Sequence, residues 1–235
     1  MFNKPRDASQ PRTPPATTRQ PHPGTITDVV EQERARKHLG RRVNVFVEGK
    51  FSFALDASLA ARRGLEIDRY LSAQELSDLL REDGDARALA KALYFLSFRP
   101  RSEKEVRERL TRDEWPLEVI DRVIEQLRAG GALNDAQFAA DYVTGRSLSK
   151  PRGGRMLKME LSRKGVGKEE IEAALPDTDE EVQNAVFALQ KVARRFERLE
   201  EGRERDQKRI EFLQRRGFGW STARAAVHLH DEEDD

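Results

Sequence analysis

Apolar residues recur along the C-terminal half of this chain at a nearly constant interval, and this repeat limits the possible folds more than any other feature. Leu110, Leu161 and Leu213 are 51 and 52 residues apart, and other residues align when these three are superposed. The aligned sets are Trp115, Val166 and Phe218; Ile124, Leu175 and Val227; the weaker set Ile120, Ile171 and Ala223; and Gly165 with Gly217 at a turn. Such a period is typical of stacked helical units that bury apolar faces against their neighbours. We therefore predict a mainly α fold of three tandem three-helix, helix-turn-helix-like repeats that form an elongated, curved solenoid.

The segment Leu89–Asp141 shows the helix signals of such a unit most clearly. Ser102–Glu105 has the spacing of a capping box. In this motif the Ser102 hydroxyl accepts the Glu105 N–H, and the Glu105 carboxylate accepts the Ser102 N–H. Pro116 suits the first turn of a second helix, where a missing N–H costs nothing. A third helix, capped by Asn134 or Asp135, is expected to belong to the same packing module, because none of these helices can bury its apolar stripe alone.

The residues that precede the repeats have a different pattern. Residues 25–29 could form a first strand, and apolar residues alternate over 43–47 and 51–55 around a glycine turn, which is typical of a β-hairpin. Asp56 is placed to cap a short helix, and Ser72–Glu75 has the spacing of a second capping box. These signals predict a small α+β region of three strands and two helices.

Composition divides the chain further. The first residues are rich in Pro and Arg, so we predict a disordered tail there. We favour solvated charges over nucleic-acid contacts as the interpretation of its four cations: Lys4, Arg6, Arg12 and Arg19. The third repeat is expected to open with a long helix from about Asp179 to Glu201, ended by Gly202. The predicted divisions are the tail at 1–24, the α+β region at 25–84, repeats at 86–135, 136–176 and 177–230, and an acidic end at 231–235.

The sequence contains no motif typical of an enzyme active site. The chain has no cysteine, which excludes disulfides, thiolate catalysis and cysteine-ligated zinc. It has no phosphate-binding loop, dinucleotide fingerprint or zinc-protease motif. His228 and His230 would point in different directions on a helix and could not share a metal. Because these motifs are missing, we expect a protein that is not an enzyme and has no cofactor or metal. Because there is no signal sequence and no apolar run of about 18 residues, we expect it to be cytoplasmic and to have no membrane contact.

One segment departs from the overall charge balance of 43 basic and 42 acidic residues. Between residues 146 and 168 the chain carries eight cations and only one acid, Glu160. This excess of positive charge predicts a basic face that binds phosphates or an acidic protein surface. Pro151 and the pair Gly153-Gly154 lie inside the segment, so part of it is expected to be a mobile loop. An ordinary solvated helix face is the alternative, and no aromatic residue is present to stack on bases. The cations are Arg146, Lys150, Arg152, Arg155, Lys158, Arg163, Lys164 and Lys168.

The first two repeats, and the region before them, contain a set of short motifs that occur together. They are Ala92–Ser97, Arg101-Ser102-Glu103, Glu105-Val106-Arg107 with Leu110, Gly131–Asp135 with Phe138-Ala139, Arg146, Gly154 with Leu157, Glu160-Leu161 with Lys164-Gly165-Val166, and, before the repeats, Asn44–Gly49 and Leu65–Glu75. In combination these motifs resemble the RecX family. The similarity covers roughly residues 25–229 and is strongest between 88 and 175. Trp115-Pro116 departs from the family's usual glycine turn, Asn134 stands where Asp is common, and the third repeat is degenerate.

The resemblance implies a non-enzymatic regulator of RecA in DNA repair, homologous recombination and the SOS response. Members of the family bind in the groove of the RecA–DNA filament and mostly inhibit its ATPase and strand-exchange activities. For this chain the partners would be RecA and its filament, with weak direct contact to single- or double-stranded DNA through the basic face. We expect the chain to act as a monomer.

Two other functions stay open from the residues alone. Three helix-turn-helix-like units could bind duplex DNA directly, but Leu117, Glu118 and Asp121 stand where a recognition helix needs Arg, Asn or Gln. The repeats could also form a scaffold for an unrelated protein partner.

Overall fold

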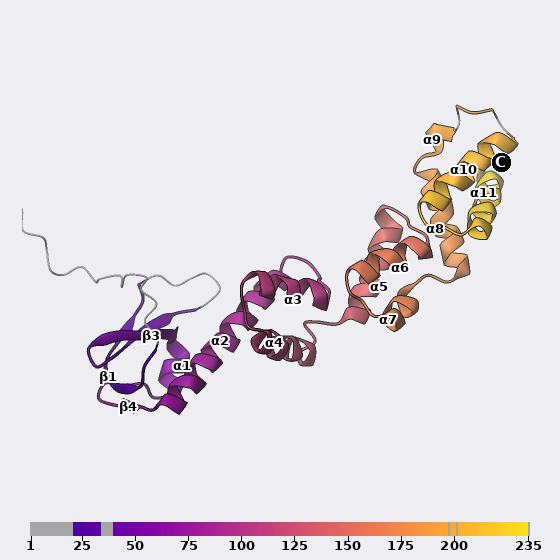
Figure 1. Cartoon of the computed structure of the whole chain (residues 1–235). Coiled ribbons are helices and arrows are strands. Elements are labelled where there is room, and N and C mark those ends of the chain that lie inside the picture. Colours follow the sequence, from indigo (N-terminus) through magenta and orange to yellow (C-terminus); the bar gives the residue numbers. More distant parts are fainter. Residues whose placement is uncertain (1–20, 34–39, 197, 201, 235) are drawn as a thin grey trace, which may run out of the picture. The chain divides into compact units, whose positions relative to one another are not determined.

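A computed structural model of the chain describes residues 21–33, 40–196, 198–200 and 202–234 (Figure 1). The chain divides into two compact units, Met1–Lys91 and Ala92–Asp235. The predicted disordered tail lies outside the described residues as far as residue 20. Its last residues differ from the prediction, because the His22 N–H donates to Ser52 Oγ at 3.2 Å and Gly24 begins a strand. In the part of the chain that the structure describes, no helix is both long and apolar enough to cross a lipid bilayer.

The described residues of the first unit form a four-stranded antiparallel sheet with the order β3-β2-β1-β4. The predicted hairpin is present, with Val45 opposite Phe53. The fourth strand was not predicted, because two residues are too few to show an alternating pattern. The elements are β1 (Gly24–Glu31), β2 (Arg42–Val47), β3 (Lys50–Asp56), α1 (Ala57–Arg62), β4 (Tyr70–Leu71) and α2 (Ala73–Leu96).

Both predicted caps of the first unit are confirmed. The Asp56 carboxylate accepts hydrogen bonds from the N–H groups of Ser58 and Leu59. Ser72 and Glu75 bond each other's backbone N–H groups at the start of α2. Helix α2 continues through Gly84, so the division expected at 84–86 falls inside a helix. An interior glycine costs a helix only about 1 kcal/mol, which tertiary packing easily outweighs.

The second unit contains the tandem three-helix repeats that the sequence predicts. Each repeat makes the same turn between its last two helices, because the N–H groups of Trp115, Val166 and Phe218 donate to the carbonyls of the three aligned leucines, each at 3.2 Å. The helices of this unit after α2 are α3 (Glu103–Arg112), α4 (Leu117–Ala129), α5 (Asp135–Ser149), α6 (Gly154–Arg163), α7 (Lys168–Ala174), α8 (Thr178–Gln190), α9 (Ala193–Phe196), α10 (Arg203–Arg215) and α11 (Trp220–Asp234).

The unusual turn of the first repeat keeps the geometry of the other two. Gly165 and Gly217 have positive φ angles of 82° and 92°, and the aligned residue of the first repeat, Glu114, has a φ of 61°. A side chain pays a steric cost in this region that glycine avoids. The first repeat therefore forms the turn without glycine, at some strain.

The grouping of helices into repeats differs from the first interpretation of Leu89–Asp141. Helix α5 does not complete a module with α3 and α4, since its Phe138, Ala139 and Val143 share a core with Leu157 and Leu161 of α6. Each repeat thus begins with the helix that precedes the two helices joined by the shared turn. In the first repeat the end of α2 takes that place, where the Arg101 guanidinium lies 4.1 Å from the centre of the Phe95 ring.

Two expectations about the third repeat are wrong. The long helix predicted from Asp179 is broken after Gln190, and the short α9 brings Phe196 edge-on to Phe212 with ring centres 5.8 Å apart. The acidic end is not merely a solvated tail, because α11 continues to Asp234. Asp231 forms an ion pair with Arg209, whose side chain is only 4% exposed.

Candidate functional site

The eight cations of the predicted basic face do not form one surface. Arg146, Arg152 and Lys164 are half-buried and lie close to acids of the first and second repeats. The other five are exposed at the C-cap of α5, on α6 and at the start of α7. We call these five the α6 basic surface: Lys150, Arg155, Lys158, Arg163 and Lys168.

Two of the half-buried cations, Arg146 and Arg152, belong to an ionic network centred on Glu160. The Tyr142 hydroxyl donates to Glu160 Oε2 at 2.8 Å and accepts from Arg146 Nη2 at 2.7 Å, while Arg146 Nε lies 3.1 Å from the same carboxylate oxygen. The hydrogen bond to Tyr142 raises the pKa of Arg146, and burial raises the pKa of the Tyr142 hydroxyl. Arg152 Nε lies farther away, 3.9 Å from Glu160 Oε1. Because their charges are compensated inside the protein, these arginines serve packing more than partner binding.

Lys164 connects the second repeat to the first. Its Nζ donates to Glu105 Oε1 at 3.2 Å and lies 5.6 Å from the ring centres of both Phe138 and Tyr142. Burial alone would raise the pKa of Glu105, but hydrogen bonds and the nearby positive charges lower it. The carboxylate therefore stays ionised and holds Lys164 at this junction.

The N-terminus of α3 docks on the turn of the second repeat. The fully buried Ser102 hydroxyl accepts the Glu105 N–H at 3.3 Å and donates to the Lys164 carbonyl at 2.6 Å. The neighbouring Glu103 N–H donates to Asp135 Oδ1 at 2.9 Å. The Arg-Ser-Glu motif thus has a physical role, since it caps one repeat and joins it to the next.

The second and third repeats are joined in an equivalent way. The Gly153 N–H donates to the Arg216 carbonyl at 3.1 Å, and Arg216 aligns with Lys164 in the repeat. The Gly154 N–H donates to Glu181 Oε1 at 2.6 Å. In the same way the Glu103 N–H donates to Asp135, so at both junctions an N–H at the start of a helix bonds an acid of the next repeat. Both junctions therefore place the N-terminus of a short helix on the turn of the next repeat.

Replacing Ser102 with Ala is expected to lower the free energy of unfolding by about 2–3 kcal/mol. The loss of an N-cap costs about 1 kcal/mol, and leaving the Lys164 carbonyl without its donor costs about 1–2 kcal/mol more. Urea unfolding followed by circular dichroism measures the change. Ser72→Ala is the matched control, because Ser72 caps α2 but bonds only Glu75, and it should cost about 1 kcal/mol. Equal losses in the two variants would contradict the junction role of Ser102.

The prediction that the loop before α6 is mobile is wrong, because this loop is packed against the third repeat. Pro151 and Gly153 are buried, and a Cβ atom on Gly153 would lie 2.2 Å from the Phe218 N atom. The Arg216 guanidinium also approaches the Pro151 carbonyl, at 3.5 Å. The glycine permits a close backbone approach between repeats and does not provide mobility.

The α6 basic surface keeps the cations that are free to meet a partner. Lys150, Lys158 and Arg163 make no side-chain ion pair with any described residue. Arg155 Nη2 donates weakly to the Gln214 carbonyl at 3.3 Å, and Lys168 stands 4.0 Å from Glu172 with 86% of its side chain exposed. Exposed cations without partners can meet phosphate or carboxylate groups without breaking an internal bond.

Sequence reasoning missed a second exposed group in the third repeat. Trp220, the first residue of α11, is 58% exposed, and the Arg224 guanidinium lies 5.4 Å from its ring centre. They border a groove of about 730 Å³ between α8 and α11. The signal in the sequence is an aromatic residue and a cation four residues apart, which the density of cations along the chain does not reveal. Among the described residues, no group of His, Asp or Glu is arranged to hold a metal ion.

The chain is similar to known proteins over all three of its repeats. The family models of the first, second and third three-helix domains of RecX match residues 88–127, 134–175 and 179–227. The regulatory protein RecX of Bacillus velezensis is 32% identical over 196 residues, covering 83% of this chain and 74% of the relative. That of Levilactobacillus brevis is 32% identical over 216 residues, covering 88% and 79%. A crystal structure of regulatory protein RecX superposes with a TM-score of 0.66 at 26% identity, covering 84% of this chain and 96% of the other.

Proposed function

This chain belongs to the RecX family of regulatory proteins, and we propose that it binds RecA and the RecA–DNA filament and inhibits the ATPase and strand-exchange activities of RecA. It would act in DNA repair and homologous recombination. The resemblance in its first two repeats points to this partner, and all three domains of the family match the chain. We further propose that it acts as a cytoplasmic monomer, without a cofactor and without an enzymatic activity of its own.

The observation that carries the proposal is the α6 basic surface. Its five exposed cations lie in one repeat, at the C-cap of α5, on α6 and at the start of α7, and the other three cations of the segment pair with Glu160 or Glu105 inside the protein. A filament of protein on DNA offers both phosphates and acidic side chains to such a surface. Charge complementarity of this kind raises the association rate and fixes orientation.

Charge reversal at Arg155 and Lys158 tests the proposal. Increasing amounts of the wild-type protein should inhibit the ATPase of RecA on single-stranded DNA, and R155E/K158E should need about tenfold more protein, because about 1.4 kcal/mol of lost contact energy corresponds to that factor. K208E/R215E is the matched control, since it reverses two exposed charges on α10 outside the α6 basic surface.

Three outcomes would count against the proposal or part of it. If the wild-type protein does not inhibit RecA at stoichiometric concentrations, RecA regulation is wrong. If both double variants lose inhibition equally, the contact is not located on the α6 basic surface. If the protein binds duplex DNA tightly without RecA and with a steep salt dependence, it acts as a stand-alone DNA-binding protein.

A further inference from the structure

The exposed face of the last helix changes character in the third repeat. The register of the sequence repeat aligns Asp121, Glu172 and Arg224, each 11 residues after one of the aligned leucines, and all three are exposed. The helices α4 and α7 therefore present an acid at a position where α11 presents a cation. Four residues earlier the aligned residues are Leu117, Lys168 and Trp220, so only the third repeat combines an exposed indole with a cation one turn later. We call Trp220, Arg224 and His228 the α11 face.

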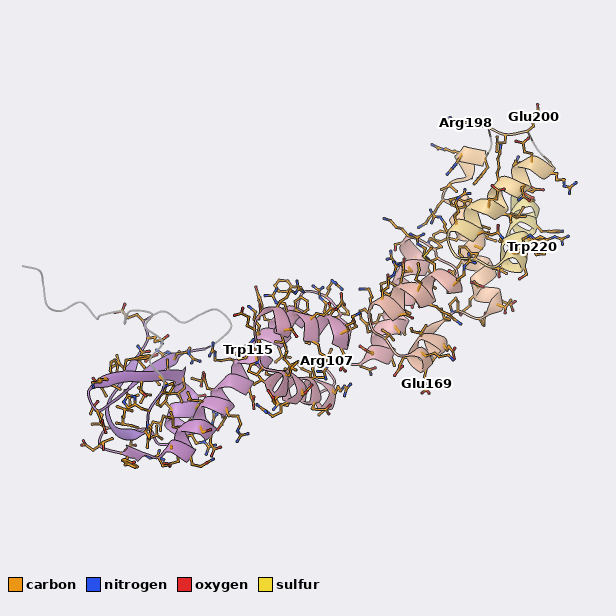
Figure 2. All side chains as sticks on the ribbon, in the orientation of Figure 1. Arg107, Trp115, Glu169, Arg198, Glu200 and Trp220 are labelled. Carbon is orange, nitrogen blue, oxygen red and sulfur yellow. The ribbon has the colours of Figure 1, made fainter. Side chains whose placement is uncertain are left out.

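The α11 face borders a groove with an apolar floor. Val182 of α8 and Leu229 of α11 line this groove and are half-buried, while Trp220 and Arg224 stand at its edge. Figure 2 labels Trp220 beside α11, in the yellow C-terminal part of the ribbon. The groove can therefore receive a flat ring beside the indole, with the Arg224 guanidinium close by, 5.4 Å from the centre of the Trp220 ring.

The chemistry of this face suits a nucleotide better than a protein. Besides Trp220, the large apolar side chain of α8–α11 that is exposed in the described residues is Phe187, which lies under Lys191 at 4.4 Å. A stable protein interface needs a larger apolar centre than one indole ring. An aromatic ring beside an arginine is instead what proteins use to stack a base and hold its phosphate.

We propose that the α11 face binds single-stranded DNA, with one base stacked on the Trp220 indole and an adjacent phosphate at Arg224. The strand must be single, because the bases of a duplex have no free face for stacking. This inference rests on the proposed function, in which the RecA filament brings single-stranded DNA to the chain. Asp179 also lines the groove and repels phosphate, so it directs the backbone of the strand toward Arg224.

Trp220 fluorescence reports the binding directly. The chain has two tryptophans, so a Trp115→Phe background leaves Trp220 as the only one. Titration of this protein with an oligomer of thymidylate should quench its fluorescence.

In anisotropy measurements with the labelled oligomer, Trp220→Ala should weaken binding roughly 5- to 100-fold, while Trp220→Phe should retain most of the affinity. Arg224→Ala should reduce the slope of log affinity against log salt by about 0.7, and Asp179→Asn should tighten binding.

The matched controls remove equivalent side chains elsewhere. Leu117→Ala truncates the aligned residue of the first repeat, which is 68% exposed, and Arg215→Ala removes an exposed cation from α10 of the same repeat. Neither should change the affinity for the oligomer as the α11 variants do. If Trp220→Ala binds the oligomer as tightly as Leu117→Ala does, the inference is overturned.

Inhibition of RecA by the same variants separates this inference from the proposed function. If the wild-type protein inhibits RecA and Trp220→Ala keeps its affinity for the oligomer, RecA regulation stands and the DNA contact at α11 fails. If Trp220→Ala loses inhibition but binds the oligomer normally, the face contacts protein, which also overturns the inference. If the oligomer binds Trp220 as expected but the wild-type protein leaves RecA unaffected, the DNA contact stands and the proposed function fails.

Discussion

Replacing Asp83 with Ala is expected to lower the free energy of unfolding of the N-terminal unit by about 3–5 kcal/mol. The Asp83 side chain is 5% exposed and its partner Arg42 is 10% exposed, with Arg42 Nη2 3.0 Å from Asp83 Oδ2. Asp83 Oδ1 also accepts the Asp56 N–H at 2.9 Å. Removal of one member of a buried ion pair leaves the other charge without compensation in a poorly solvated site. Hydrogen exchange of the amides of β2 and β3 measures the loss.

The neighbouring residue on α2 provides the control. Glu82 pairs with Arg63 at 2.6 Å, but both side chains are at least one-third exposed, so Glu82→Ala should cost less than about 1 kcal/mol. The double variant Arg42→Met/Asp83→Leu should recover much of the lost stability, because it leaves no buried charge unpaired. Equal exchange rates in Asp83→Ala and Glu82→Ala would contradict the importance of burial.

Local signals predicted much of this fold because they depend on residues close in sequence. The capping boxes at Ser102 and Ser72 involve a spacing of three residues, and both form as expected. The repeat register depends on apolar residues at a fixed period, and the three turns share one hydrogen bond. The turn at Glu114 shows the limit of this reasoning, since its residue type gave no sign of a positive φ angle.

The candidate site was harder to predict because it depends on residues that are distant in sequence. The sequence shows eight cations and one acid between residues 146 and 168, but Glu105 of the first repeat also pairs with Lys164. Position on the helix decides which cations remain exposed, and the partners across a junction decide which are neutralised. Density of charge therefore identified the segment, while only the packing separates the α6 basic surface from the ionic network.

The glycines before α6 show the same difficulty in a different form. A Pro and two glycines within four residues are typical of a flexible loop, which is the interpretation that the sequence favoured. The structure instead uses Gly153 for close contact with Gly217, which is distant in sequence. A glycine that allows mobility and a glycine that allows close approach look identical until the neighbouring repeat is placed.

Replacing Gly153 with Ala is expected to cost about 3 kcal/mol or more and to open the junction between the second and third repeats. Gly153 has a φ of −75°, which alanine adopts without strain, so the whole effect comes from contact. The new Cβ would lie 2.2 Å from the Phe218 N atom and 2.4 Å from the Gly217 O atom. These are backbone atoms that no rotamer change can move away, so the overpacking cannot be relieved locally. The hydrogen bonds from Gly153 to Arg216 and from Gly154 to Glu181 would be lost with the contact.

Gly145→Ala in the same repeat is the matched control. Gly145 lies within α5, and a Cβ there would meet no atom within 4 Å, so this variant should stabilise the protein by about 0.5–1 kcal/mol. In a repeat protein each unit contacts only its neighbours, so Gly153→Ala should speed hydrogen exchange in α10 and α11 and leave α3 and α4 nearly unchanged. If Gly153→Ala exchanges like Gly145→Ala, the glycine contact does not hold the repeats together. If the third repeat alone loosens, the close approach of Gly153 to Gly217 and Phe218 is needed to hold the third repeat on the second.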